Sequence, residues 1–78
     1  NLALAFKALE MGGNMPCILN AANDVAVQAF LDEKIGLLQI SDIVEESMNL
    51  IPRIELPTLS DYFETDIQTR KKAIELIK

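Results

Sequence analysis

Residues 17–31 read Cys-Ile-Leu-Asn-Ala-Ala-Asn-Asp-Val-Ala-Val-Gln-Ala-Phe-Leu, an apolar run that contains two amides and a carboxylate. The spacing predicts a helix that begins near Asn14 to Pro16 and continues to about Lys34, before Gly36. Apolar residues recur along it at helical spacing and form one wide face: Ile18, Leu19, Ala22, Val25, Ala26, Ala29 and Phe30. We expect this helix to be the centre of the fold.

Two further helices are predicted beside it. An apolar stripe from Leu2 to Leu9 predicts a first helix that ends at Gly12-Gly13, since glycine past a helix end accepts positive φ. Residues 35–40 are expected to form an extended connector, because no second strand is present to pair with them. The next helix is predicted to start at the cap Ser41 and to end at Pro52. Its apolar positions are Ile40, Ile43, Val44, Met48 and Ile51.

The carboxy-terminal part predicts an extended segment and then helix. Prolines fix φ over residues 52–57, so this segment is expected to lack ladder hydrogen bonds. Two capping patterns follow closely, which predicts a break in the helix near Glu64: Thr58 with Asp61, and Thr65 with Gln68. The last helix is expected to place three isoleucines on one side: Ile67, Ile74 and Ile77. The sequence therefore predicts an all-α fold, a small bundle of about four helices in a single domain, residues 1–78.

Charge and composition exclude several classes of protein. A formal net charge of −5 argues against a nucleic-acid-binding surface, and a helix-turn-helix DNA-binding reading conflicts with it. No apolar run approaches the length of a membrane span, and no signal peptide is visible. A lone Cys17 favours a reducing, cytoplasmic location. The chain begins at Asn1, inside a helix-like pattern, so we expect it to be a piece of a longer protein.

The main candidate site is the polar trio Asn20, Asn23 and Asp24. These residues lie at i, i+3 and i+4, so they share a helix face. We interpret them as a structural polar network that hydrogen-bonds a neighbouring loop or helix, since an unpaired buried amide costs about 1–3 kcal/mol. A ligand or metal site is the alternative, but the chain has no His and the trio has one carboxylate, which is too few ligands for a metal cage.

Other candidate sites have simpler explanations. Gly12-Gly13 lacks the remaining residues of a phosphate loop and is explained as a helix stop. Cys17 near a helix start could be a nucleophile, but without a His base it is better explained as a small buried side chain. A basic cluster, which the helix dipole near a carboxy terminus explains without an anion, comprises Arg70, Lys71, Lys72 and Lys78.

The central stretch resembles the Leu-Asn-Ala-Ala-Asn-Glu-x-Ala-Val signature of the carboxy-terminal domain of the 1-deoxy-D-xylulose 5-phosphate reductoisomerase family. Asp24 departs from that pattern, because the family commonly has Glu at this position. Order and spacing agree through most of the chain, at Leu2-Ala3-Leu4-Ala5, Ala8, Gly12-Gly13, Asn20 to Phe30, Lys34-Ile35, Ile40, Pro57, Asp66, Arg70 and Ala73.

The resemblance implies a homodimeric parent enzyme that uses NADPH and a divalent metal, magnesium or manganese. Such an enzyme converts 1-deoxy-D-xylulose 5-phosphate to 2-C-methyl-D-erythritol 4-phosphate in non-mevalonate isoprenoid biosynthesis. The family's dinucleotide loop, Asp-x-Glu metal pair and Ser-Asn-Lys segment have no counterpart here. We therefore expect this chain alone to be inactive, to hold no catalytic, cofactor or metal residue, and to brace the catalytic and nucleotide-binding domains of the same chain.

Two alternatives remain open at this point. The first is a free-standing acidic carrier or protein-interaction module, although carriers present Asp-Ser at a helix start and here no Asp precedes a Ser. The second concerns assembly: a chain with an unprotected apolar surface can self-associate, or swap a helix through residues 35–40.

Overall fold

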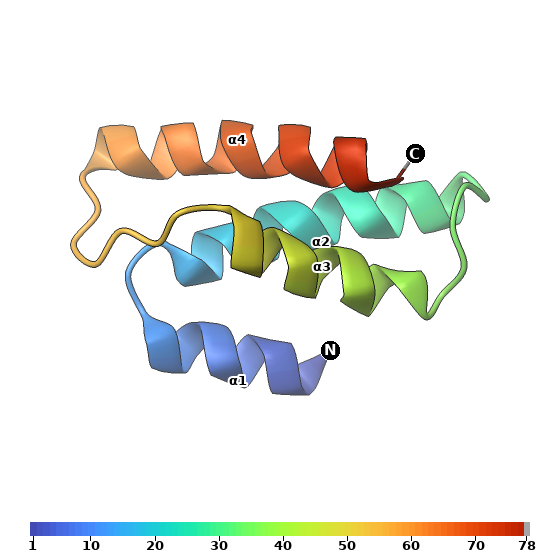
Figure 1. Cartoon of the computed structure of the whole chain (residues 1–78), viewed down its shortest axis with the longest axis horizontal. Coiled ribbons are helices and arrows are strands. Elements are labelled where there is room, and N and C mark those ends of the chain that lie inside the picture. The colour runs from blue at the N-terminus through green and yellow to red at the C-terminus, as the bar shows by residue number, and fades with distance from the viewer. Residues whose placement is uncertain (78) are drawn as a thin grey trace.

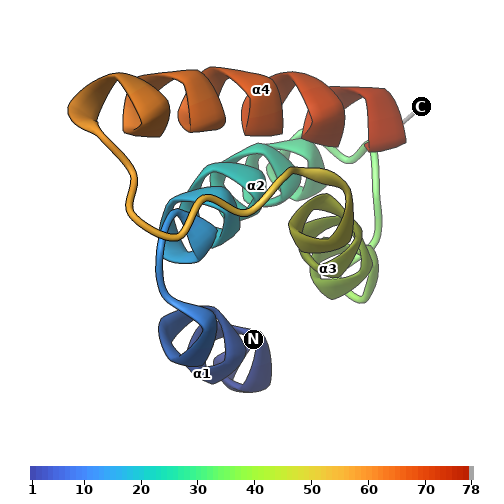
Figure 2. The ribbon, with the colours of Figure 1, turned by 60° about the vertical axis from the view of Figure 1, so that its left-hand side comes forward.

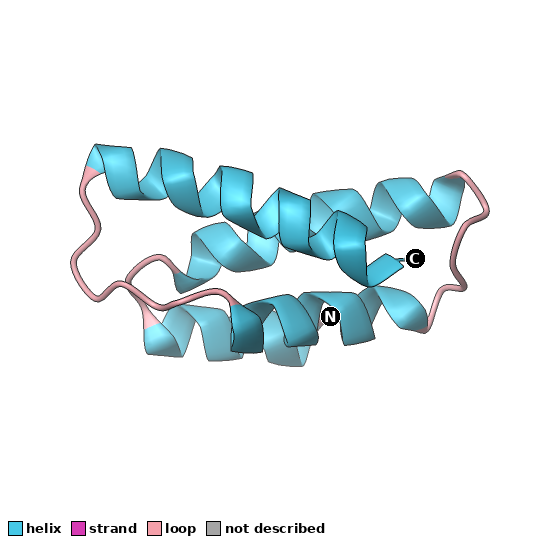
Figure 3. Ribbon diagram, turned by 45° about the horizontal axis from the view of Figure 1, so that its top comes forward, coloured by secondary structure: helices cyan, strands magenta, loops and turns pink. Residues whose placement is uncertain are grey.

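The computed structural model describes residues 1–77, and these residues form four helices without a strand (Figures 1 and 3). This result confirms the predicted all-α bundle. None of the four helices in residues 1–77 is long and apolar enough to span a membrane. The helices are α1 (Leu2–Met11), α2 (Met15–Leu31), α3 (Gln39–Leu50) and α4 (Leu59–Ile77).

Helix α2 is the centre of the fold, as predicted, and packs against the other three helices. Figure 2 shows α2 between α1 and α4, with α3 to one side. Its small alanines are fully or almost fully buried, which lets the neighbouring helices approach closely. The core consists of Met15, Ile18, Ala22, Ala26 and Ala29 of α2 with Leu4, Ala8, Ile35, Ile43, Val44, Met48, Ile51 and Ala73.

The turn between α1 and α2 depends on two glycines. Gly12 has φ 66° and ψ −156°, a conformation open almost only to glycine, so α1 ends there as predicted. Gly13 also has positive φ, and a Cβ at this position would collide with the carbonyl oxygen of Ile54. The Arg53 guanidinium donates to the Met11 carbonyl oxygen at the end of α1. The turn is therefore held tightly against the segment that follows α3.

Helix α2 ends at Leu31, three residues before the predicted end at Lys34. The Lys34 N–H donates to the Ala29 carbonyl at 2.9 Å, and the Glu33 N–H donates to the Phe30 carbonyl at 3.0 Å. This pair of bonds is the Schellman motif, which needs a left-handed residue. Glu33 is that residue, with φ 60°. The prediction was wrong because it assigned the helix stop to the nearest glycine instead.

Helix α3 begins at Gln39, so the prediction of Ser41 as its cap was wrong. The Gln39 side-chain oxygen accepts the Gly36 N–H at 2.7 Å and orders the turn before the helix. Ser41 instead accepts a hydrogen bond from the Asn1 side chain at 3.1 Å, which joins α3 to α1. The helix ends before Pro52, as predicted, with Ile51 extended.

Helix α4 is continuous, and the predicted break near Glu64 is absent. The first capping pair was correct: the Thr58 N–H donates to Asp61 Oδ2 at 2.9 Å, and the Asp61 N–H donates to Thr58 Oγ1 at 3.1 Å. Thr65 is not a second cap. It is buried inside the helix on a core-facing side with Thr69 and Ala73, while two of the three predicted isoleucines, Ile67 and Ile74, are exposed.

Candidate functional site

The polar trio lies on exposed positions of α2, and only Asp24 is hydrogen-bonded to another helix within residues 1–77. Asp24 Oδ2 accepts a hydrogen bond from Arg70 Nη2 of α4 at 3.1 Å. Arg70 Nε also donates to Asp66 Oδ2 at 3.0 Å, so one guanidinium joins two carboxylates. These bonds, first to Asp66 and then to Asp24, raise the pKa of Arg70 further above its usual range. Asp24 therefore connects α2 to α4.

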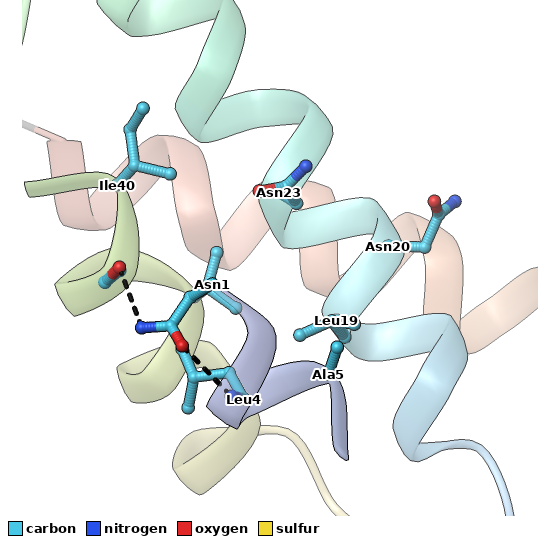
Figure 4. Close-up of a pocket in the computed structure, with 9 residues that line it drawn as sticks. Asn1, Leu4, Ala5, Leu19, Asn20, Asn23 and Ile40 are labelled. Atoms are coloured by element: carbon cyan, nitrogen blue, oxygen red, sulfur yellow. Dashed lines mark hydrogen bonds between the residues drawn. The ribbon is translucent and has the colours of Figure 1, made fainter. Parts of the chain in front are cut away.

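Asn20 and Asn23 take no part in this contact with α4. Both line a hollow of about 220 Å³ between α1, α2 and α3 (Figure 4). Within residues 1–77 neither side chain forms a hydrogen bond to another residue, and both are exposed to solvent. Figure 4 shows the Asn20 amide directed away from α1. The remaining lining residues are Asn1, Leu4, Ala5, Leu19, Ile40, Ser41 and Val44.

The buried polar centre of the fold is Asn14, which sequence reasoning treated only as a helix start. Its side chain is fully buried and accepts the Ile54 N–H at 2.8 Å. Its amide nitrogen donates to the Pro52 carbonyl at 3.1 Å and to Thr65 Oγ1 at 3.0 Å. Asn14 thus joins the α1–α2 turn, the segment after α3, and α4. The only sequence signal was an asparagine between Gly13 and the first turn of a helix.

Cys17 lies on α2, half-buried, with Sγ 3.7 Å from the Tyr62 carbonyl oxygen of α4. Burial raises the pKa of this thiol, the Asp66 carboxylate raises it further, and Arg70 opposes both. A raised pKa keeps the thiol protonated and therefore unreactive at neutral pH. The geometry favours the structural interpretation of this cysteine over a nucleophilic one.

The predicted basic cluster is not a compact site among the described residues. Arg70 is engaged by Asp24 and Asp66, and Lys72 Nζ lies 3.1 Å from Glu75 Oε1. Lys78 lies outside the described residues. Across residues 1–77, no group of three His, Cys, Asp or Glu side chains is arranged to hold a metal ion.

The sequence of this chain matches a known protein family. The family described as "DXP reductoisomerase C-terminal domain" matches residues 1–72. The chain is 51% identical over 77 residues to a 1-deoxy-D-xylulose 5-phosphate reductoisomerase of Phocaeicola vulgatus. It is 49% identical over the same length to the enzyme of that name from Bacteroides fragilis. Each match covers 99% of this chain and 20% of the relative.

A solved structure shows the same fold. The reductoisomerase of Zymomonas mobilis, determined in complex with NADPH, superposes with a TM-score of 0.91 at 40% sequence identity. The superposition covers 99% of this chain and 20% of that one. This chain therefore spans about a fifth of the length of the proteins it matches.

Proposed function

Since the chain belongs to the family of DXP reductoisomerase C-terminal domains, we propose that it is the terminal helical domain of such an enzyme and braces the catalytic part. The whole enzyme would convert 1-deoxy-D-xylulose 5-phosphate to 2-C-methyl-D-erythritol 4-phosphate as a homodimer. NADPH and a divalent metal would be held by the domains outside this chain. The observation that carries the proposal is the family match over residues 1–72.

The chemistry of the described residues supports a role without catalysis. The one cysteine has a raised pKa, and the cationic Arg70 is occupied by two carboxylates. Asn20 and Asn23, by contrast, are exposed amides whose hydrogen-bonding groups are unused within residues 1–77. Amides in this state can bind the backbone of a neighbouring domain and set its orientation. We propose that the trio performs this structural task in the whole enzyme.

The test replaces Asn20 and Asn23 together by Ala in the full-length enzyme. We expect the melting temperature to fall while the turnover number per folded molecule stays close to that of the parent, because the amides hold a domain boundary and do not contact substrate. The matched control replaces two exposed amides elsewhere, Asn49 and Gln68, and should change neither quantity. An unchanged melting temperature with a lost turnover would contradict the bracing role.

A further inference from the structure

Helices α1, α2 and α4 form a layer, and α3 packs on one side of it. Figure 2 shows α2 in the middle of this layer, with α3 on one side and no helix of the chain on the other. The outer side chains of α3 are those of a solvent-facing helix: Asp42, Glu45, Glu46 and Asn49 are all exposed. The question is then which exposed side chains lie on the side of the layer that α3 does not cover.

Helix α4 directs apolar side chains to the side without α3. Phe63, Ile67, Arg70 and Ile74 are spaced by three or four residues, so they share one stripe of the helix. The bond from Arg70 to Asp24 turns this stripe towards the outer surface of α2. Phe63 is 64% and Ile67 67% exposed. The opposite side of α4 is polar and meets the end of α3, where Ile51 shares a groove with Gln68, Lys72 and Glu75.

Helix α1 directs a second apolar stripe to the same side. Leu2, Phe6 and Leu9 follow helical spacing and are 72%, 63% and 68% exposed. Leu4 and Ala8, on the opposite side of α1, are buried in the core, so the stripe points away from the core. The other helices in residues 1–77 therefore leave this stripe largely uncovered.

The outer surface of α2 lies between these two stripes. Asn20 and Asp24 are one turn apart on it, and Val27 is three residues further. This arrangement has apolar margins and a few polar groups at its centre, of which the Asn20 amide has no partner in residues 1–77. Soluble domains rarely expose so many large apolar side chains on one side unless another protein surface covers them.

We propose that this surface, called here the open face and defined by Leu2, Phe6, Leu9, Asn20, Phe63 and Ile67, is where the catalytic part of the same reductoisomerase chain docks. The inference rests on the proposed function. One observation selects this occupant over a second copy. This domain is 20% of the length of its relatives and is carboxy-terminal in its family, so most of the chain precedes it.

The test measures how accessible single positions are in the full-length enzyme. Cysteine is introduced at Leu9, at Phe63 and, as a control, at Leu50, which is 51% exposed on α3. Each variant is labelled with a small maleimide, and peptide mass spectrometry reads the rate at each position, normalised to the rate in urea. We expect L9C and F63C to be labelled about tenfold or more slowly than L50C, because docking closes the open face to reagent.

The possible outcomes separate this inference from the function on which it rests. Protection of L50C alone would mean that the domain docks through α3, which overturns the inference and leaves the bracing role intact. Equal, rapid labelling at all three positions would mean that no other domain covers this one, which overturns both. Protection that disappears on dilution would identify a second copy as the occupant and would also overturn the inference.

Discussion

The Asn14 amide donates a buried hydrogen bond of 3.0 Å to the Thr65 hydroxyl, across 51 residues of sequence. The same side chain accepts the Ile54 N–H and donates to the Pro52 carbonyl. Three segments that are distant in sequence therefore meet at one amide. A buried polar group whose partners are all present stabilises one arrangement of the helices, since any other arrangement would leave those groups unpaired.

Replacing Asn14 by Ala should lower the free energy of unfolding by about 2–4 kcal/mol, because it removes three hydrogen bonds and leaves the Ile54 N–H unpaired. Urea unfolding followed by circular dichroism measures this change. The control is Asn49→Ala, at an exposed amide on α3, which should change the free energy by less than about 0.5 kcal/mol. Equal effects of the two variants would contradict the role assigned to Asn14.

Two threonines one turn apart on α4 should respond oppositely to the same substitution. The Thr69 hydroxyl is buried without a partner within residues 1–77, so Thr69→Val should raise the free energy of unfolding by about 1 kcal/mol. Thr65→Val removes an acceptor of the Asn14 amide and should lower it by a similar amount. Thermal melts of both variants provide the measurement. A lower melting temperature for Thr69→Val would indicate a hydrogen bond that the structure does not show.

The left-handed Glu33 that ends α2 is a site where glycine should be stabilising. A non-glycine residue in this conformation costs about 1–2 kcal/mol, so Glu33→Gly should raise the free energy of unfolding by about 1 kcal/mol. Asp32→Gly is the matched control and should be destabilising, because Asp32 has φ −84° and gains nothing from glycine. If both variants were destabilised equally, the Schellman geometry at Glu33 would be wrong.

The raised pKa of Cys17 predicts slow alkylation and a specific pH dependence. Burial keeps the thiol protonated in the folded protein, so iodoacetamide should modify it more slowly at pH 8 than an unstructured cysteine peptide. The unfolded chain loses this proton first, because its pKa is the lower one. The free energy of unfolding is therefore unaffected by this thiol at neutral pH. It decreases as the pH rises above the thiol pKa of the unfolded chain, about 8.5. Reaction as fast as that of the peptide would contradict the burial.

The sequence-based predictions succeeded where the determinant was local. The pair Thr58 and Asp61 forms the expected reciprocal cap, and Gly12 ends α1, because both depend on residues within one turn. The trio Asn20, Asn23 and Asp24 does lie on one helix, but its side chains are exposed and only Asp24 is hydrogen-bonded within residues 1–77. Sequence spacing did not predict that Arg70 would donate a hydrogen bond to Asp24, since the two residues are 46 positions apart.

The sequence by itself determined that this chain forms helices around α2, because apolar periodicity and glycine placement act within single segments. Tertiary structure decided the rest. Thr65 matches a capping pattern yet lies inside a continuous α4, because its hydroxyl meets Asn14 in the core and leaves the backbone helical. The apolar stripes of α1 and α4 came to share the open face only when both helices packed beside α2. No local pattern encodes such a shared face, since it depends on how the helices are oriented relative to one another.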